Sequence, residues 1–230
     1  MKRRAFLTAA GALAVSACAT PPLGVFLAAE VPAPAWRSGD RWTYRRTDGY
    51  NGVPRGVLTR TVESADAGGI RFVTRDETGI VLDDALFGSP GVQTSGTLSE
   101  DGPVRGAFTP ALRMYDFPLY SGKQWGQSLV RADAQGFRTL MRASVRVEGW
   151  DDARAGGSLH RSIVIRRNLV LGPKDPFSGI LYREELEWYA PDLRGAAHKR
   201  TDEHIYTGEE AFAWLPGDRF VYALESFQLV

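Results

Sequence analysis

Apolar and polar side chains alternate through most of the chain after residue 36, and this pattern constrains the fold more than any other feature. It is clearest in residues 139–149, where every second side chain is apolar: Met141, Ala143, Val145 and Val147. Successive side chains of a β-strand point to opposite faces, so a period of two indicates strands with one buried face. No convincing stretch shows the period of 3.6 that an amphipathic helix requires. We therefore expect an all-β body, built as an antiparallel meander with short turns between consecutive strands.

The expected strands are long, and their length favours a curved sheet. They occupy residues 41–47, 57–64, 70–75, 125–132, 139–149, 160–171, 181–190, 196–206 and 220–229. Those from residue 139 onward exceed the usual length of about five or six residues, and long strands coil. We expect a half-barrel or a barrel whose inside is filled by side chains, a lid or a ligand. Residues 79–118 are weakly patterned and rich in glycine and proline, so we expect them to cover one end, with Asp83 and Asp84 in turns or caps.

Residues 181–190 contain an apolar set and a charged set of alternate side chains. The apolar set is Tyr182, Leu186 and Trp188, and the charged set is Arg183, Glu185 and Glu187. We expect the apolar set to face the interior and the charged set to face water.

The six tryptophans are the compositional excess that points towards a ligand. Aromatic rings bury a large area and keep one polar contact, which suits an apolar ligand or a sugar on a concave sheet. Core packing explains the same rings, so both interpretations stay open. The candidate ligand surface consists of Trp42, Trp125, Tyr182 and Trp188.

The beginning of the chain has the pattern of a helical export signal. Three basic residues precede an uncharged, largely apolar run over residues 5–17, which is shorter than the roughly 20 residues of a transmembrane helix. The Val-Ser-Ala-Cys segment that ends at Cys18 resembles the bacterial lipobox, in which the cysteine is lipidated before cleavage. The alternative is ordinary cleavage near residue 17 or 19, which leaves Cys18 a free thiol. Both twin-arginine and Sec export fit the pair Arg3-Arg4.

These features divide the chain into three parts. Residues 1–17 are the expected signal peptide, residues 18–36 the lipidated Cys18 with a linker rich in proline and alanine, and residues 37–230 a single β-rich domain. Ala19 is not the aspartate associated with inner-membrane retention, so the lipobox resemblance implies an anchor in the outer membrane, facing the periplasm. Loss of the three leading basic residues changes the formal charge from +1 to −2, which gives no electrostatic basis for binding nucleic acid.

Motifs for catalysis, metals and cofactors are missing from the sequence. There is no Gly-x-Ser-x-Gly elbow and no phosphate-binding loop, and Cys18 is the only cysteine. His198 and His204 would lie about 20 Å apart on one strand face, too far to share a zinc ion, so we expect neither metal nor cofactor. Glu185 and Glu187 would lie about 6.6 Å apart, which leaves a carboxylate-pair hydrolase as a remote alternative.

Four segments together resemble a loose class of uncharacterised bacterial envelope proteins. They are Phe117–Trp125, Val147–Trp150, Trp188–Arg194 and Leu224–Phe227. The resemblance implies an envelope lipoprotein and carries no accepted activity or catalytic residue. We therefore expect a non-enzymatic protein, anchored to the membrane at Cys18, that binds an apolar ligand or a hydrophobic partner segment on its curved sheet. The alternative is a structural or assembly lipoprotein that binds an envelope protein partner and no ligand.

Overall fold

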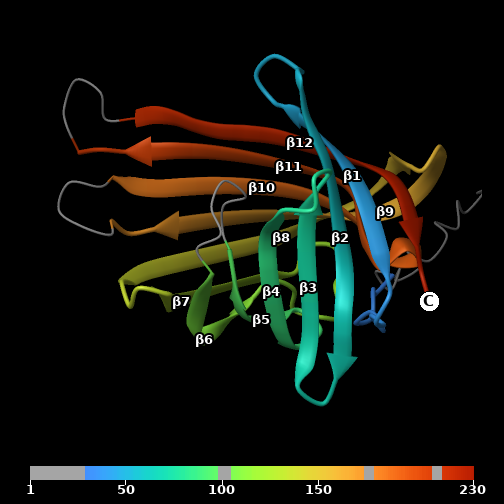
Figure 1. The fold of residues 1–230 in the computed structure, drawn as a ribbon, viewed down its shortest axis with the longest axis horizontal. Helices are drawn as coiled ribbons and strands as arrows, with labels where there is room; N and C mark the ends of the chain where they lie inside the picture. The colour runs from blue at the N-terminus through green and yellow to red at the C-terminus, as the bar shows by residue number, and fades with distance from the viewer. Residues whose placement is uncertain (1–28, 98–104, 174–178, 209–213) are drawn as a thin grey trace, which may run out of the picture.

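The described residues fold into a closed β-barrel of twelve strands, each antiparallel to its neighbours. The computed structural model describes residues 29–97, 105–173, 179–208 and 214–230 (Figure 1). The strands are β1 (Arg41–Asp48), β2 (Pro54–Asp66), β3 (Gly69–Asp76), β4 (Val81–Ser89), β5 (Val92–Gly96), β6 (Gly106–Arg113), β7 (Gln124–Asp133), β8 (Arg138–Ala155), β9 (Ser158–Leu171), β10 (Ile180–Ala190), β11 (Gly195–Tyr206) and β12 (Trp214–Gln228). Consecutive strands pair, and β12 returns to pair with β1. The all-β meander is confirmed, and the sheet closes.

The barrel is flattened into two layers. In Figure 1, β8 to β12 run across the view while β1 to β4 cross in front of them at a steep angle. Two apolar clusters fill the inside. One contains Trp42, Phe72, Ile165 and Tyr189, and the other contains Phe108, Met141 and Leu169. The alternation expected in residues 139–149 is confirmed, because the named apolar side chains of β8 are buried and their neighbours are exposed.

Residues 79–118 depart from the expectation. Instead of covering one end, their described part contains β4, β5 and β6, which are strands of the barrel wall. Register shifts interrupt the pairing of β4 with β5 and of β5 with β6, so the period of two is broken and the sequence loses its strand signal. Asp83 and Asp84 lie within β4 and not in turns or caps.

Strand β10 has the opposite orientation to the one expected. Arg183, Glu185 and Glu187 are buried inside the barrel, whereas Tyr182, Leu186 and Trp188 are partly exposed on the outer face. The outer face is itself polar: Glu184 pairs with Arg166, and the Trp188 indole donates to Asp151. Periodicity identifies side chains that share a face, but it does not say which face is enclosed.

The last residues of the expected linker pack against the body. Val31 is buried and forms a β-bridge with Leu119. The Trp36 ring lies edge-on to Phe72 at 4.9 Å, and its Nε1 donates to the carbonyl of Arg194. The packed body therefore includes residues that precede 37. The expected signal peptide, Cys18 and the start of the linker lie outside the described residues.

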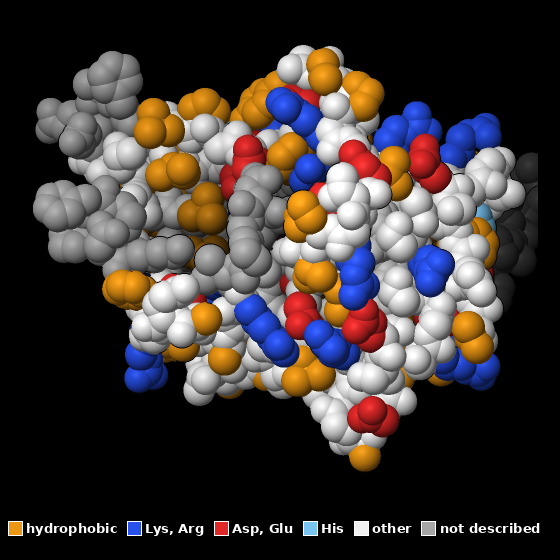
Figure 2. All heavy atoms as spheres, in the orientation of Figure 1, with side chains coloured by type: hydrophobic (Ala, Val, Ile, Leu, Met, Phe, Trp, Pro, Cys, Tyr) orange, Lys and Arg blue, Asp and Glu red, His pale blue; other side chains and the backbone are white. Residues whose placement is uncertain are grey.

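Charges of both signs intermix on the outer face of β2 to β4, which is visible in Figure 2. Arg71 pairs with Asp84 at 2.9 Å and Arg75 with Glu63 at 2.6 Å. Exposed pairs of this kind contribute little to stability, typically about 0–1 kcal/mol, and indicate a solvated surface. Within the residues described, no helix has the length and apolar character needed to cross a bilayer.

Candidate functional site: a charged cavity inside the barrel

A network of buried charges lies inside the barrel, where Arg167 on β9 stands between Ile165 of one apolar cluster and Leu169 of the other. At its centre, Glu187 accepts a hydrogen bond from the Tyr115 hydroxyl at 2.7 Å and another from Nη1 of Arg167 at 2.6 Å. Arg167 is only 1% exposed, and its Nε donates to the carbonyl of Met114. Its guanidinium also lies 4.7 Å from the centre of the Tyr115 ring. Glu187 and Arg167 therefore form a hydrogen-bonded ion pair out of contact with bulk water.

The network continues to a second carboxylate. Glu185 accepts from Nε of Arg183 at 2.9 Å, and it lies 3.4 Å from Nη1 of Arg167 and 3.7 Å from Nζ of Lys199. Arg183 also donates to Glu203 at 3.0 Å. Burial by itself would raise the pKa of the Glu185 carboxyl, but the three neighbouring cations outweigh burial and lower the pKa from 4.5 to about 2.

Strand register explains why these groups meet. Glu185 is directly opposite Arg167 across β9 and β10, and Arg183 is directly opposite Glu203 across β10 and β11. Directly opposite side chains on one face of an antiparallel pair have Cβ atoms about 5 Å apart, within reach of an ion pair. The network is thus a product of cross-strand pairing.

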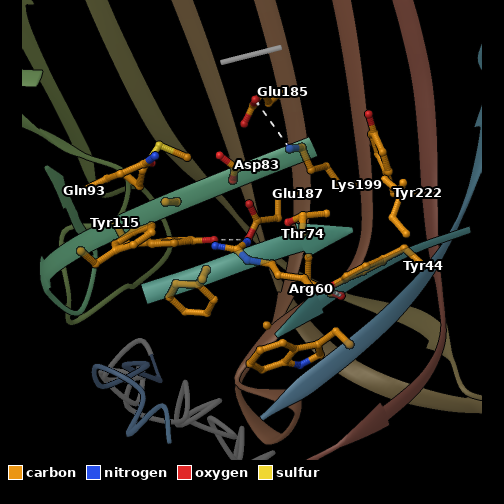
Figure 3. A pocket seen from close by; sticks show the side chains of 18 of the residues that line it. Tyr44, Arg60, Thr74, Asp83, Gln93, Tyr115, Glu185, Glu187, Lys199 and Tyr222 are labelled. Carbon is orange, nitrogen blue, oxygen red and sulfur yellow. Dashed lines mark hydrogen bonds and ion pairs between the residues drawn. The ribbon is translucent and has the colours of Figure 1, made fainter. Parts of the chain in front are cut away.

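Beside the network is a cavity of about 150 Å³ that opens to the outside (Figure 3). One wall comes from the crossing layer, where Arg60 on β2, Thr74 on β3 and Asp83 on β4 are in lateral register. The opposite wall carries Glu187 and Lys199, which also lie directly opposite each other. An aromatic group completes the lining: Trp36, Trp42, Phe72 and Phe87.

Two charged residues that line the cavity, Arg60 and Asp83, differ from those of the network because they form no ion pair with the described residues. The guanidinium carbon of Arg60 lies 4.3 Å from the centre of the Phe72 ring, and its buried Nε has no hydrogen-bond partner among the described residues. Asp83 accepts from the backbone nitrogen and the hydroxyl of Thr97, at 2.9 and 2.8 Å. Within the described part of the chain, neither Arg60 nor Asp83 forms an ion pair.

Two phenols of the cavity wall, Tyr44 and Tyr115, are neutral donors. Burial raises the pKa of Tyr115 well above its ordinary value, and the negative charge of Glu187 raises it further. Burial likewise raises the pKa of Tyr44, whose hydroxyl donates to the carbonyl of Ala196 at 2.9 Å. Both hydroxyls keep their protons at any physiological pH.

Glu185 and Glu187 both line the cavity, so their surroundings test the hydrolase alternative. A glycosidase of this kind needs one carboxyl that is protonated and can act as an acid. The low pKa of Glu185 keeps that group ionised. Both oxygens of Glu187 accept hydrogen bonds, one from Arg167 and one from Tyr115. Neither group is arranged to donate a proton, so the geometry favours structural ion pairs.

The structure separates the aromatic residues that the sequence grouped as a ligand surface. Trp42 lines the cavity, and its Nε1 donates to the carbonyl of Leu193 at 2.8 Å. Trp125 is half-buried and donates to the carbonyl of Arg113. Tyr182 lies on the outer face of β10, 4.8 Å from the ring of Trp214, and Trp188 is on the same face. Of the four candidates, Trp42 alone is among the residues that line this cavity.

The two histidines considered for metal binding also lie on the outer face. His198 packs against Trp188, with ring centres 4.9 Å apart, and His204 is six residues further along β11. Across the described ranges, no three histidine, cysteine, aspartate or glutamate side chains gather as metal ligands.

Sequence patterns did not predict Arg60, Asp83 or Lys199 as site residues. A signal for Arg60 was present, because Leu58 and Val62 are its neighbours on the same face and both are apolar. An arginine between two apolar residues at a spacing of two indicates a charge that points into the core. Arg167 has apolar neighbours of the same kind. Asp83 had no comparable signal, since the pattern around β4 is interrupted.

A scan against protein-family models gave no match, and a search of the curated proteins gave none either. Two solved structures share the architecture. A candidate exported protein of YmcC-like fold from Bacteroides fragilis aligns with a TM-score of 0.51 and 14% identity, covering 87% of this chain and 100% of that one. A candidate lipoprotein from Parabacteroides distasonis aligns with a TM-score of 0.50 and 14% identity, covering 86% and 99%. The barrel is similar in fold to the YmcC-like proteins. At this identity the likeness concerns the fold alone.

Proposed function

We propose that this protein is a lipid-anchored, non-enzymatic envelope protein that holds a small ligand inside its barrel. The anchor is Cys18, which follows a signal segment and resembles the lipidated residue of a lipobox. The descriptions of the two structural neighbours, one as exported and one as a lipoprotein, support the same location. The residue after Cys18 favours the outer membrane, with the barrel facing the periplasm.

The observation that carries the binding role is the open cavity between a charged wall and an aromatic wall. Its volume of about 150 Å³ suits a small molecule, since an engineered cavity of this size in another protein takes up benzene. A lipid chain or a peptide segment needs more room. Charged side chains on one wall also disfavour a wholly apolar occupant, because that occupant would remove their water without replacing its hydrogen bonds. The apolar ligand expected from the sequence is therefore revised to one with both polar and apolar parts.

A cavity-filling variant tests this proposal. The Thr74 side chain lies in the cavity wall between Arg60 and Asp83. Thr74→Phe would place a ring in the ligand space. We expect full-length protein, released from membranes in mild detergent and then denatured, to yield a small molecule detectable by mass spectrometry. The same extract from folded Thr74→Phe protein, checked by circular dichroism, should lack that molecule.

Two results would contradict the ligand role. One is an empty extract from the wild-type protein, and the other is the same molecule recovered equally from both proteins. Either result would favour the assembly role. That role draws on the exposed aromatic residue Trp214, which packs against Tyr182 and Tyr206 on the outer face.

A further inference from the structure

The charges that face the barrel interior are mostly neutralised by one another. Arg183 pairs with Glu185 and Glu203, and Arg167 pairs with Glu187. Two further lining cations also have partners: Lys199 lies near Glu185, and Arg194 binds Asp40 at 2.9 Å. Among the described lining residues, this leaves Arg60 and Asp83 as one cation and one anion that form no ion pair.

Arg60 and Asp83 are placed to act on one molecule. Arg60 is directly opposite Thr74, and Thr74 is directly opposite Asp83, so the three form one row across β2, β3 and β4. Adjacent strands are about 4.8 Å apart, which puts the Cα atoms of Arg60 and Asp83 about 10 Å from each other. Figure 3 shows both side chains directed into the same cavity, on either side of Thr74. A ligand seated above Thr74 would lie between them.

We propose that the ligand is a small zwitterion of the α-amino acid type, with its carboxylate at Arg60 and its ammonium at Asp83. This rests on the proposed binding function and adds the chemical class of the ligand. A guanidinium forms paired hydrogen bonds with a carboxylate, and Arg60 lines the cavity without an ion pair among the described residues. Asp83 supplies an acceptor for the ammonium through the oxygen that Thr97 does not occupy.

Ligands with a single charge fit this cavity less well. An anion bound at Arg60 would leave the negative charge of Asp83 facing it without a counter-charge, and a cation bound at Asp83 would do the same to Arg60. Burying an unpaired charge is unfavourable, so the zwitterion is favoured over either half of itself. The apolar side chain of the ligand would contact the aromatic wall formed by Trp36, Trp42 and Phe72. The cavity volume limits that side chain to a few carbons.

Three matched probes test the charge requirement by isothermal titration calorimetry of the dialysed protein at pH 7. They are L-norvaline, pentanoate, which lacks the ammonium, and butylamine, which lacks the carboxylate. We expect norvaline to bind at least about tenfold more tightly than either of the other two. Pentanoate or butylamine binding within twofold of norvaline would overturn the zwitterion assignment.

Variants that remove one charge each test whether Arg60 binds the carboxylate and Asp83 binds the ammonium. Arg60→Gln should weaken norvaline about tenfold or more while butylamine binding is kept or improved. Asp83→Asn should weaken norvaline towards the affinity of pentanoate, while pentanoate itself is kept or improved. Arg142→Gln, on the exposed face of β8, is the control and should leave the affinity for every probe unchanged. Equal loss of all three probes in both variants would indicate a structural role for Arg60 and Asp83 and would overturn the proposal.

The outcomes separate this inference from the proposed function. If none of the probes binds but denatured wild-type protein still yields a molecule that Thr74→Phe lacks, the zwitterion assignment fails and the ligand role stands. If no probe binds and no molecule is extracted, both fail.

Discussion

Single residues inside this barrel carry charge where most proteins place apolar side chains. Arg167, Glu185 and Glu187 are 1%, 4% and 3% exposed. Such groups are tolerated only when each charge has a partner at hydrogen-bonding distance, and removing one partner typically costs about 3–5 kcal/mol. Here Glu187 receives a tyrosine hydroxyl as well as an arginine, so both of its oxygens are occupied. The interior charges are therefore fixed by one another, and the protonation of Glu185 is linked to folding.

This linkage predicts acid sensitivity from Glu185. Its pKa in the folded chain, about 2, lies below the ordinary 4.5, so its contribution to stability is complete above about pH 4.5 and is lost as the pH falls towards 2. The contribution is on the order of 3 kcal/mol, at about 1.4 kcal/mol per pKa unit. Urea unfolding at pH 6, 4 and 3 should show the free energy of unfolding falling less steeply in Glu185→Gln than in wild type. Glu184→Gln, a half-exposed carboxylate on the same strand, is the control and should keep the wild-type slope. Identical slopes for all three proteins would rule out the low pKa.

At the scale of one element, β10 shows how a strand can be built with its charged side inward. The inward residues end in Tyr189, which is buried among aromatic rings, and the charged ones before it meet partners on β9 and β11. The outward side carries Leu186 and Trp188, whose neighbours are long cationic side chains. Arg200, for example, lies 5.6 Å from the centre of the Trp188 ring. The apolar stems of such side chains cover an outward leucine or tryptophan without enclosing it.

Two glutamine substitutions on neighbouring strands should therefore lower the free energy of unfolding by very different amounts. Leu186→Gln on the outer face of β10 should cost less than about 1 kcal/mol, because its amide remains in contact with water. Ile165→Gln on β9, which is fully buried and directly opposite Glu187, should cost about 3 kcal/mol or more, because a polar amide enters the core without a partner. Chemical denaturation monitored by tryptophan fluorescence measures both. A Leu186→Gln variant as unstable as Ile165→Gln would mean that the enclosed face has been assigned incorrectly.

For the molecule as a whole, closure of the barrel brings together the two ends of the folded body. β1 pairs with β12 along its entire length, and Asp40, just before β1, accepts from the backbone nitrogen of Val230. Closure removes the free strand edges that would otherwise promote aggregation. It also encloses the cavity between two layers whose residues are far apart in the sequence. The body is thus a self-contained unit of the described residues.

The anchor proposed at Cys18 yields a prediction for the full chain. Several acyl chains on one residue hold a protein at a bilayer durably, since each buried CH₂ contributes about 0.8 kcal/mol. Cells that express the full chain should incorporate labelled palmitate into it, and the protein should sediment with outer membranes. Cys18→Ser should abolish labelling and release a folded protein into the soluble fraction. Wild-type protein that is soluble, unlabelled and reactive with a thiol reagent would support ordinary signal cleavage instead.

The sequence by itself determined the class of fold, because a period of two is a local property that each strand displays without its neighbours. It also determined which side chains share a face, as β8 and β11 show. Tertiary structure decided which face of β10 is enclosed, because the charge of Glu187 is neutralised by Arg167 and its carboxylate accepts a hydrogen bond from Tyr115, which are 20 and 72 residues away along the chain. Tertiary structure also decided that β4 to β6 belong to the barrel wall, where they pair despite register shifts. The cavity with Arg60 and Asp83 exists only because the sheet closes and its two layers cross, and no local pattern specifies that crossing.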